Sequence, residues 1–289
     1  MVFDKWVLST SAIATLLAPV LVGFAPNPAQ NSTSQISPTL VSISFPRSPG
    51  SGRGPARTAS GGTRTTACFV KGSANGAIPM TVLMPTNNVG TTVDADPALF
   101  LYIPESRIDG GEVRIFKQGE DTDVYVGAFD LSNKLGNTPG IVKLNLKDAN
   151  LEPGKTYQWN FTTFCLNETG ERETLPSPFL EGIFQRTPLT PTQENQLEQA
   201  ETPLDKAEIY ARSGVWNETL NLVEQLRPSD PQEWTDLLES VELEELADIP
   251  YFGEAQLMAE DDKSGAEAPA DSLSRDEINS PSTPIEGLW

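Results

Sequence analysis

Apolar and polar positions alternate with a period of two through the middle of the chain, between residues 80 and 186. Seven short runs carry this alternation, with turn-forming residues between them: MTVLMP (80–85), ALFLYIP (98–104), GEVRIFK (111–117), TDVYVGAFDL (122–131), GIVKLNL (140–146), KTYQWNFTTFC (155–165) and FLEGIFQR (179–186). Such alternation is typical of strands with one buried face. Because no helical segment intervenes, the pattern predicts an antiparallel β-sandwich over residues 67–188.

The string LEPGKTYQWNF (151–161) predicts how one of these strands begins. A leucine, a Pro-Gly turn and then Tyr157 resemble the tyrosine corner of immunoglobulin-like and fibronectin-like sandwiches. Alternation places Tyr157, Trp159, Phe161, Thr163 and Cys165 on one face. We expect that face to point inward and to serve core packing. A ligand-stacking platform is the alternative.

The periodicity becomes helical after residue 191. The segments predicted to be helical are TPLDKAEIYARSG (202–214), VWNETLNLVEQLRP (215–228) and DPQEWTDLLESV (230–241). Thr202 is the expected N-cap of the first, Pro203 its first helical residue, and Gly214 the residue after its end. Asp230 and Pro231 repeat the start signal.

The first two of these segments fit a tetratricopeptide-like hairpin, within a helical region predicted over residues 189–249. Ala207, Tyr210, Gly214, Trp216 and Pro231 fall in the tetratricopeptide register, although Thr219 stands where alanine is usual. A single hairpin cannot bury its own apolar face. It must therefore pack on the sandwich, on the Trp234 helix or on a partner. We expect a mixture of the first two, and the third makes Tyr210, Trp216 and Trp234 candidate partner-binding residues.

The N-terminal sequence MVFDKWVLSTSAIATLLAPVLVGFAPNPAQ indicates export. Lys5 precedes an apolar run over residues 6–24 and then small residues, as in a secretory signal peptide, which we predict over residues 1–29. An uncleaved anchor helix is the alternative, but Pro19 makes the run a poor membrane span. We therefore expect a periplasmic, envelope-associated or secreted protein with no stable membrane span after cleavage.

Export determines how the two cysteines, Cys68 and Cys165, are interpreted. In an oxidising compartment they predict one disulfide. The loop that it closes, about 98 residues long, corresponds to a stabilisation of up to ~4.7 kcal/mol in the chain-entropy model. Two separate buried thiols are the alternative.

Both flanks of the predicted sandwich are biased in charge. The stretch RSPGSGRGPARTASGGTRTTAC (47–68) has no acidic residue, in a chain of formal net charge -20. It falls mostly in a predicted disordered arm, residues 30–66, where Arg53, Arg57 and Arg64 could bind an anionic envelope polymer or the acidic tail. A linker with no fixed partner is the alternative. Residues 250–289 are acidic and low in hydrophobicity, which predicts a disordered tail.

Composition excludes several kinds of chemistry. The chain has no histidine, so Ser-His-Asp and Cys-His catalysis and imidazole metal sites are absent. Its acidity disfavours nucleic acid as a partner. Carboxylate pairs remain, but 40 acidic residues make accidental pairs abundant. The Asp94-Ala-Asp96 and 120–123 clusters could bind calcium, but solvated turns fit them better. The sequence thus identifies no catalytic residue, cofactor or metal ligand.

Several motifs in fixed order resemble a family of exported cyanobacterial proteins, domain of unknown function 928. The motifs that carry the resemblance are GGTRTTAC (61–68), TVLMPTNNVGTTVDADPALFLYIP (81–104), NTPGIVKLNL (137–146), LEPGKTYQWNFTTFC (151–165) and ARSGVWNETLNLVEQL (211–226). The resemblance covers about residues 45–249. It implies export and a cyanobacterial origin, and it supplies no activity or site residue.

Taken together, the sequence predicts an exported, non-enzymatic binding or scaffolding protein. Its expected partner is an unidentified protein or an anionic envelope polymer. The alternative from another functional class is a carboxylate-dependent hydrolase of cell-envelope polysaccharide.

Overall fold

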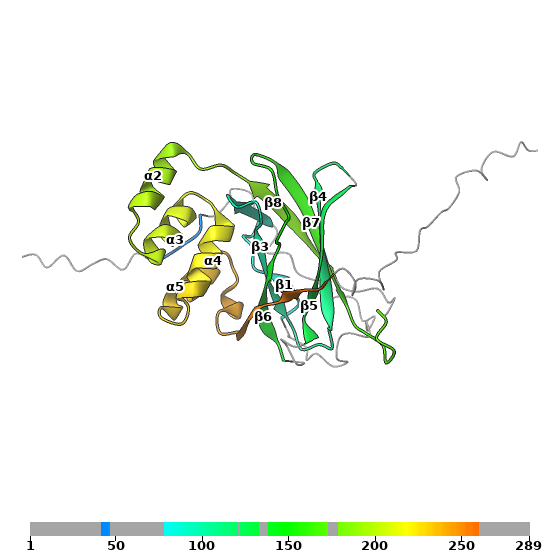
Figure 1. The fold of residues 1–289 in the computed structure, drawn as a ribbon. Coiled ribbons are helices and arrows are strands. Elements are labelled where there is room, and N and C mark those ends of the chain that lie inside the picture. The colour runs from blue at the N-terminus through cyan, green and yellow to red at the C-terminus, as the bar shows by residue number, and fades with distance from the viewer. Residues whose placement is uncertain (1–41, 47–77, 121, 133–137, 173–178, 260–289) are drawn as a thin grey trace, which may run out of the picture. The chain divides into compact units, whose positions relative to one another are not determined.

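The computed structural model describes residues 42–46, 78–120, 122–132, 138–172 and 179–259, which form two β-sheets and a group of helices (Figure 1). The strands are β1 (Thr81–Val82), β2 (Val89–Thr92), β3 (Ala98–Ile103), β4 (Gly110–Lys117), β5 (Asp123–Asp130), β6 (Gly140–Asn145), β7 (Thr156–Phe164), β8 (Phe179–Arg186), β9 (Tyr251–Glu254) and β10 (Gln256–Leu257). A strand thus forms at each of the seven predicted ranges, and β4 begins one residue before its range. β2, β9 and β10 were not predicted.

The smaller sheet has the strand order β1-β3-β6-β9, and the larger has the order β10-β5-β4-β7-β8-β2. Six of the eight strand pairings among the described residues are antiparallel. The prediction of a wholly antiparallel sandwich is wrong for the other two, because β2 runs parallel to β8 and β9 runs parallel to β6. In both pairings a strand that the sequence analysis missed extends the edge of a sheet.

The two sheets enclose one hydrophobic core, which gives a sandwich-like arrangement. The smaller sheet contributes Leu99, Leu101, Val142 and Leu144, and the larger contributes Val113, Ile115, Phe129, Tyr157, Trp159, Phe161 and Phe184. On β7 the predicted inward face is confirmed, since Tyr157, Trp159, Phe161, Thr163 and Cys165 are all at most 2% exposed. The Tyr157 hydroxyl accepts a hydrogen bond of 2.8 Å from the backbone N–H of Glu152, which fixes the turn before the strand.

The helices are α2 (Pro191–Gln199), α3 (Pro203–Arg212), α4 (Trp216–Leu226) and α5 (Pro231–Ser240), followed by the 3₁₀ turn η1 (Glu244–Leu246). The predicted start of α3 is confirmed: Thr202 caps it in a reciprocal capping box with Asp205, and Pro203 is its first residue. Gly214 ends it with a φ of 70°. Asp230 precedes α5 but makes no side-chain cap. α2 was missed because it buries no residue and so lacks an apolar stripe, although Thr190 and Gln193 form a capping box.

The helices cover the outer face of the smaller sheet and create a second hydrophobic cluster there (Figure 1). β3 is therefore buried on both faces. Its residues Leu99, Leu101 and Ile103 face the larger sheet, and Ala98, Phe100 and Tyr102 belong to the cluster with the helices. The hairpin thus packs on the sandwich and on the Trp234 helix, as the apolar pattern predicted. The resulting layers are the larger sheet, the smaller sheet and the helices.

Two segments predicted to be disordered are ordered where the structure describes them. Residues 42–46, within the predicted arm, pack against the helices. Residues 251–257, at the start of the predicted tail, form β9 and β10. The rest of the arm, the signal peptide predicted over residues 1–29 and the tail from residue 260 lie outside the described residues.

The disulfide remains a prediction, because Cys68 lies outside the described residues. Cys165 is 2% exposed and belongs to the core between the sheets. We expect the protein isolated from an oxidising compartment to be two hydrogen atoms lighter than the dithiol form. Mass spectrometry after alkylation under denaturing conditions, with and without prior reduction, measures this. Alkylation of both cysteines without reduction would exclude the bond.

Candidate binding cleft

The first turn of α4 attaches the helices to the smaller sheet and to the segment after β2. Trp216 Nε1 donates a hydrogen bond of 3.0 Å to the carbonyl oxygen of Leu83, and its indole is 1% exposed. Asn217 Oδ1 accepts a 3.0 Å hydrogen bond from the backbone N–H of Ala98. These contacts place α4 at a fixed distance from the β2–β3 connection.

Glu218, the next residue of α4, holds the β2–β3 connection by a single carboxylate oxygen. Its Oε1 accepts hydrogen bonds from Thr92 Oγ1 at 2.8 Å, from the Val93 N–H at 2.9 Å and from the Asp94 N–H at 3.0 Å. Its side chain is mostly buried, and this burial raises the pKa of its carboxyl group above the ordinary value. The three donors favour the ionised form, but they do not offset the loss of hydration.

A cleft of about 240 Å³ opens beside this contact. α3, α4 and the β2–β3 connection line it, through Asp94, Asp96, Pro97, Lys206, Tyr210, Asn217, Glu218, Asn221, Leu222 and Gln225. The lining combines carboxylate and amide groups with the ring of Tyr210 and two apolar side chains. Burial, together with the charges of Glu218 and Asp94, raises the pKa of the Tyr210 hydroxyl, which therefore stays protonated at neutral pH.

Two acceptor oxygens of cleft-lining residues lack a donor among the described residues. They are Glu218 Oε2 and Asn221 Oδ1, and both atoms are buried. The two residues lie three positions apart on α4 and therefore share a face of the helix. A buried polar atom without a partner costs about 1–3 kcal/mol, so this part of the cleft favours a molecule that brings hydrogen-bond donors.

Of the described residues that the sequence proposed for partner binding, Tyr210 lies in the cleft, and Trp216 and Trp234 do not line it. Trp216 and Trp234 are each 1% exposed and belong to the cluster beneath the helices. Both indoles pack within this cluster, Trp216 in contact with Phe45, and their binding to a partner stays a prediction. Arg53, Arg57 and Arg64 lie outside the described residues. The sequence analysis missed Glu218 and Asn221, because an exposed and a buried polar residue look alike on an amphipathic helix.

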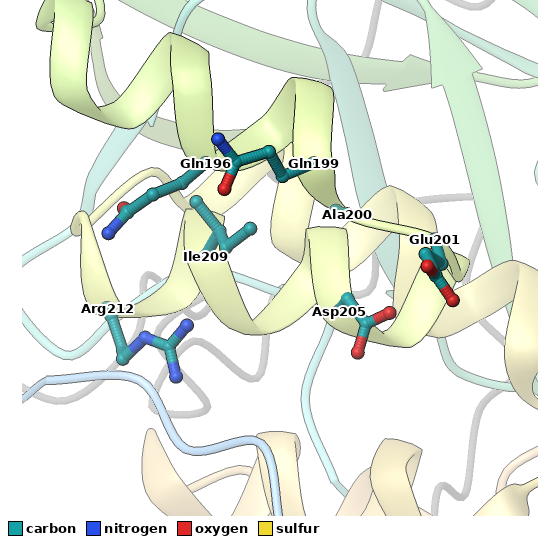
Figure 2. Close-up of a pocket in the computed structure, with 7 residues that line it drawn as sticks. All are labelled: Gln196, Gln199, Ala200, Glu201, Asp205, Ile209 and Arg212. Atoms are coloured by element: carbon teal, nitrogen blue, oxygen red, sulfur yellow. The ribbon is translucent and has the colours of Figure 1, made fainter.

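A second hollow, of about 320 Å³, lies between α2 and α3 (Figure 2). Two of its charged groups, Asp205 and Arg212, already have partners in or next to α3. Hydrogen bonding to the Thr202 side chain, and then to the Thr202 N–H, lowers the pKa of the Asp205 carboxyl group. Arg212 pairs with Glu208 at 3.3 Å. Because α2 buries no residue, this wall is also weakly anchored. The α3–α4 cleft is the better candidate.

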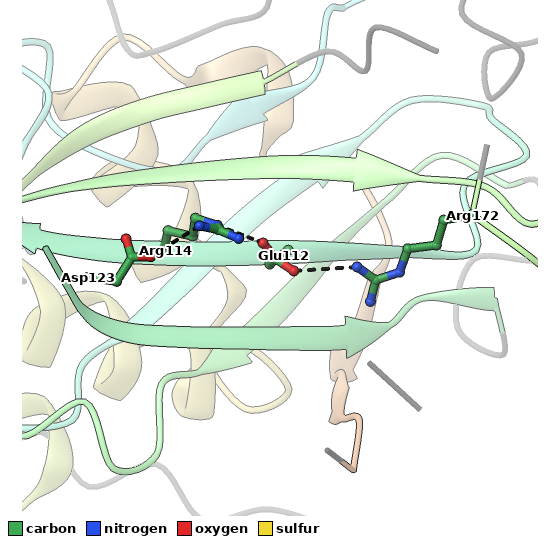
Figure 3. Close-up of polar contacts among 4 residues, drawn as sticks. All are labelled: Glu112, Arg114, Asp123 and Arg172. Atoms are coloured by element: carbon green, nitrogen blue, oxygen red, sulfur yellow. Dashed lines mark hydrogen bonds and ion pairs between the residues drawn. The ribbon is translucent and has the colours of Figure 1, made fainter. Parts of the chain in front are cut away.

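A charged network crosses the outer face of the larger sheet (Figure 3). Glu112 on β4 pairs with Arg114 at 2.8 Å and with Arg172 at 3.4 Å, and Arg114 also pairs with Asp123 at 3.1 Å. The Arg172 guanidinium lies 4.0 Å from the centre of the Phe164 ring. Two cations and two anions balance one another, so the network offers no net charge to a ligand. It is better suited to joining β4, β5 and the turn before Arg172.

Comparison with known proteins identifies a family but no activity. The model of the family described as Domain of Unknown Function (DUF928) matches residues 59–251, about two thirds of the chain. The match includes every residue that lines the cleft. No curated protein matches the chain. Within the described ranges, no helix has the length and apolar character that crossing a membrane requires. Nor do three or more acidic or cysteine side chains gather there as metal ligands would.

Proposed function

Because the chain belongs to the DUF928 family, whose description names no chemistry, we propose a function from the geometry of the cleft. The protein is an exported, non-enzymatic binding protein that holds a neutral, hydroxyl-rich glycan of the cell envelope between α3, α4 and the β2–β3 connection. The observation that carries this proposal is a pair of buried acceptors, Glu218 Oε2 and Asn221 Oδ1, to which no described residue donates.

The chemistry of the lining matches a sugar. Ligand hydroxyl groups supply the donors that the two oxygens lack, and the amides of Asn217 and Gln225 add groups that can both donate and accept. Tyr210 and Leu222 provide apolar surface for the C–H groups of a sugar ring. A volume of about 240 Å³ accommodates one or two sugar rings, so the cleft would engage a short part of a longer polymer.

The charge of the lining argues for a neutral ligand. Asp94, Asp96 and Glu218 face a single basic residue, Lys206. An anionic polymer would be repelled here. Binding of anionic envelope polymer by Arg53, Arg57 and Arg64 therefore remains a separate proposal for a different segment.

The proposal also includes export of the protein and the type of sandwich and helical hairpin that it contains. The apolar run over residues 6–24 supports export through a signal peptide. The hydrogen bond from Glu152 to the Tyr157 hydroxyl supports an immunoglobulin-like or fibronectin-like sandwich, although the two parallel pairings depart from it. The capped α3 and the turn at Gly214 support a tetratricopeptide-like hairpin.

Removal of one cleft acceptor tests the proposal. We expect the wild type to bind chitotetraose, a neutral glycan, and to sediment with peptidoglycan sacculi. Asn221→Leu should weaken both by at least ~10-fold, because one or two hydrogen bonds and the shape of the cleft are lost. Isothermal titration calorimetry and a pelleting assay measure these effects.

The matched control is Gln196→Leu, which makes the same kind of change in the α2–α3 hollow. It should bind both probes as the wild type does. Equal binding by Asn221→Leu and the wild type, or an equal loss in both variants, would contradict the assignment of the cleft. A wild type that binds neither probe would contradict the ligand class.

One observation favours a second function, a hydrolase of envelope polysaccharide. A carboxyl group with a raised pKa in a cleft can act as a general acid, and Glu218 has this property with a second carboxylate, Asp94, in the same lining. A hydrolase would release new reducing ends from sacculi, and Glu218→Gln would abolish the release while keeping the binding. Binding without release by the wild type would exclude this function.

A further inference from the structure

The five residues Ser42–Pro46 lie against the helices as an extended segment, drawn in blue beside α3 in Figure 1. Ile43 and Phe45 are buried, at 2% and 7% exposure, whereas Ser42, Ser44 and Pro46 are exposed. The alternation means that one edge of an extended chain fits into the helical layer and the other faces solvent. Both apolar side chains join the cluster formed by the helices and the smaller sheet.

Three helices contribute to the groove that holds this segment. α5 supplies the polar contacts: Glu233 Oε2 accepts a hydrogen bond of 2.8 Å from the Ile43 N–H, and Ser240 Oγ accepts one of 2.9 Å from the Phe45 N–H. α4 supplies Trp216, whose ring meets the Phe45 ring edge-on with 5.0 Å between the centres. In Figure 2 the same blue segment passes below Arg212 of α3.

These contacts have the form of peptide recognition. The backbone N–H groups of two alternate residues are bound by side chains of the groove, and the apolar side chains of those same residues enter it. Affinity then comes from the backbone and specificity from the pockets. Glu233 is itself only 8% exposed, so its carboxylate needs this donor when the groove is occupied.

The segment and its groove are separable parts of the chain. The DUF928 match begins at residue 59, so it contains α3, α4 and α5 but not Ser42–Pro46. Thirty-one residues, 47–77, connect the segment to the strand region.

We propose that the groove between α3, α4 and α5 is a docking site for an extended peptide with two apolar residues at alternate positions, and that the Ser42–Pro46 segment of the same chain occupies it reversibly. The groove is distinct from the glycan cleft, so the two proposals stand or fall separately.

A labelled peptide that spans residues 40–48 tests the proposal by fluorescence anisotropy. The groove is opened in the full chain by Ile43→Asp combined with Phe45→Asp, which leaves every groove residue in place. We expect the peptide to bind the opened protein and to bind the wild type at least ~100-fold more weakly, because the tethered segment competes at an effective concentration near millimolar. Circular dichroism confirms that the opened protein is folded.

Two control peptides separate docking from adhesion to an exposed apolar surface. The peptide with Ser44→Asp is changed at an exposed position. Its affinity for the opened protein should be within ~3-fold of that of the unmodified peptide. Ile43→Asp with Phe45→Asp should weaken binding by at least ~100-fold. Equal affinities of all three peptides, or no binding to a folded opened protein, would overturn the proposal.

A second design avoids any change to the segment. A protease site replaces residues 50–56, and cleavage leaves the segment held only by its contacts. We expect it to remain bound through gel filtration and to be displaced by excess peptide. Its loss on cleavage, with no rebinding of peptide to the folded remainder, would equally overturn the proposal.

Discussion

Trp216→Ala is expected to lower the free energy of unfolding by about 3–5 kcal/mol, the range for truncation of a large buried aromatic side chain. The indole is 1% exposed, contacts Phe45 and donates to the Leu83 carbonyl oxygen. It therefore connects the segment over residues 42–46, the helices and the smaller sheet. The loss is large against the 5–15 kcal/mol that a typical domain has in total. Urea denaturation, followed by circular dichroism at 222 nm, measures it.

Trp216→Phe is the matched variant for this experiment. It keeps an aromatic ring in the cluster and removes the hydrogen bond to Leu83, so we expect a smaller loss of about 1–3 kcal/mol. A loss below about 1 kcal/mol for Trp216→Ala would mean that the helices are not anchored through this residue. The contact between the two layers would then need another explanation.

Glu218→Ala is expected to lower the free energy of unfolding by about 2–3 kcal/mol at pH 7.5, whereas Glu218→Gln should leave it equal or raise it slightly. Alanine removes the acceptor of three hydrogen bonds, from Thr92, Val93 and Asp94. Glutamine keeps an acceptor oxygen and avoids the cost of burying a charge.

The difference in stability between Glu218→Gln and the wild type, measured as a function of pH, tests the raised pKa of Glu218. Because the pKa is higher in the folded chain than in the unfolded chain, protonation favours folding. The stabilisation from this group is fully present below the unfolded pKa, near 4.5, and is lost as the pH rises through the folded pKa. The stability of Glu218→Gln relative to the wild type should therefore increase from pH 5 to pH 7.5.

Urea titrations of both proteins across this range measure the difference. The other charged groups of the cleft, Asp94, Asp96 and Lys206, are the same in both proteins, so their titration cancels to first order. A difference that is constant with pH would contradict the raised pKa. Equal losses in the alanine and glutamine variants would contradict the role of the carboxylate oxygen as the acceptor.

The sequence by itself determined the elements whose signals are local. Short apolar or alternating runs between turn residues located seven strands, and alternation located the inward face of β7. Thr202, Pro203, Asp205 and Gly214 located both ends of α3, because capping depends only on residues within one turn. The need to bury the apolar face of the hairpin correctly placed it on the sandwich. The string ALFLYI is apolar at every position, which indicates a strand buried on both faces, as β3 is.

Only the tertiary structure decided which residues meet across the layers. β9 and β10 are short, and each pairs with a strand more than 100 residues away in sequence, so their own residues carry little signal. Glu218 and Asn221 look like solvated helix residues until α4 is placed beside the β2–β3 connection. Ile43 and Phe45 alternate with serines in a polar arm, and the groove that buries them lies about 190 residues further along the chain. In each case the stabilising contact is distant in sequence, and the local pattern does not determine which distant segment supplies it.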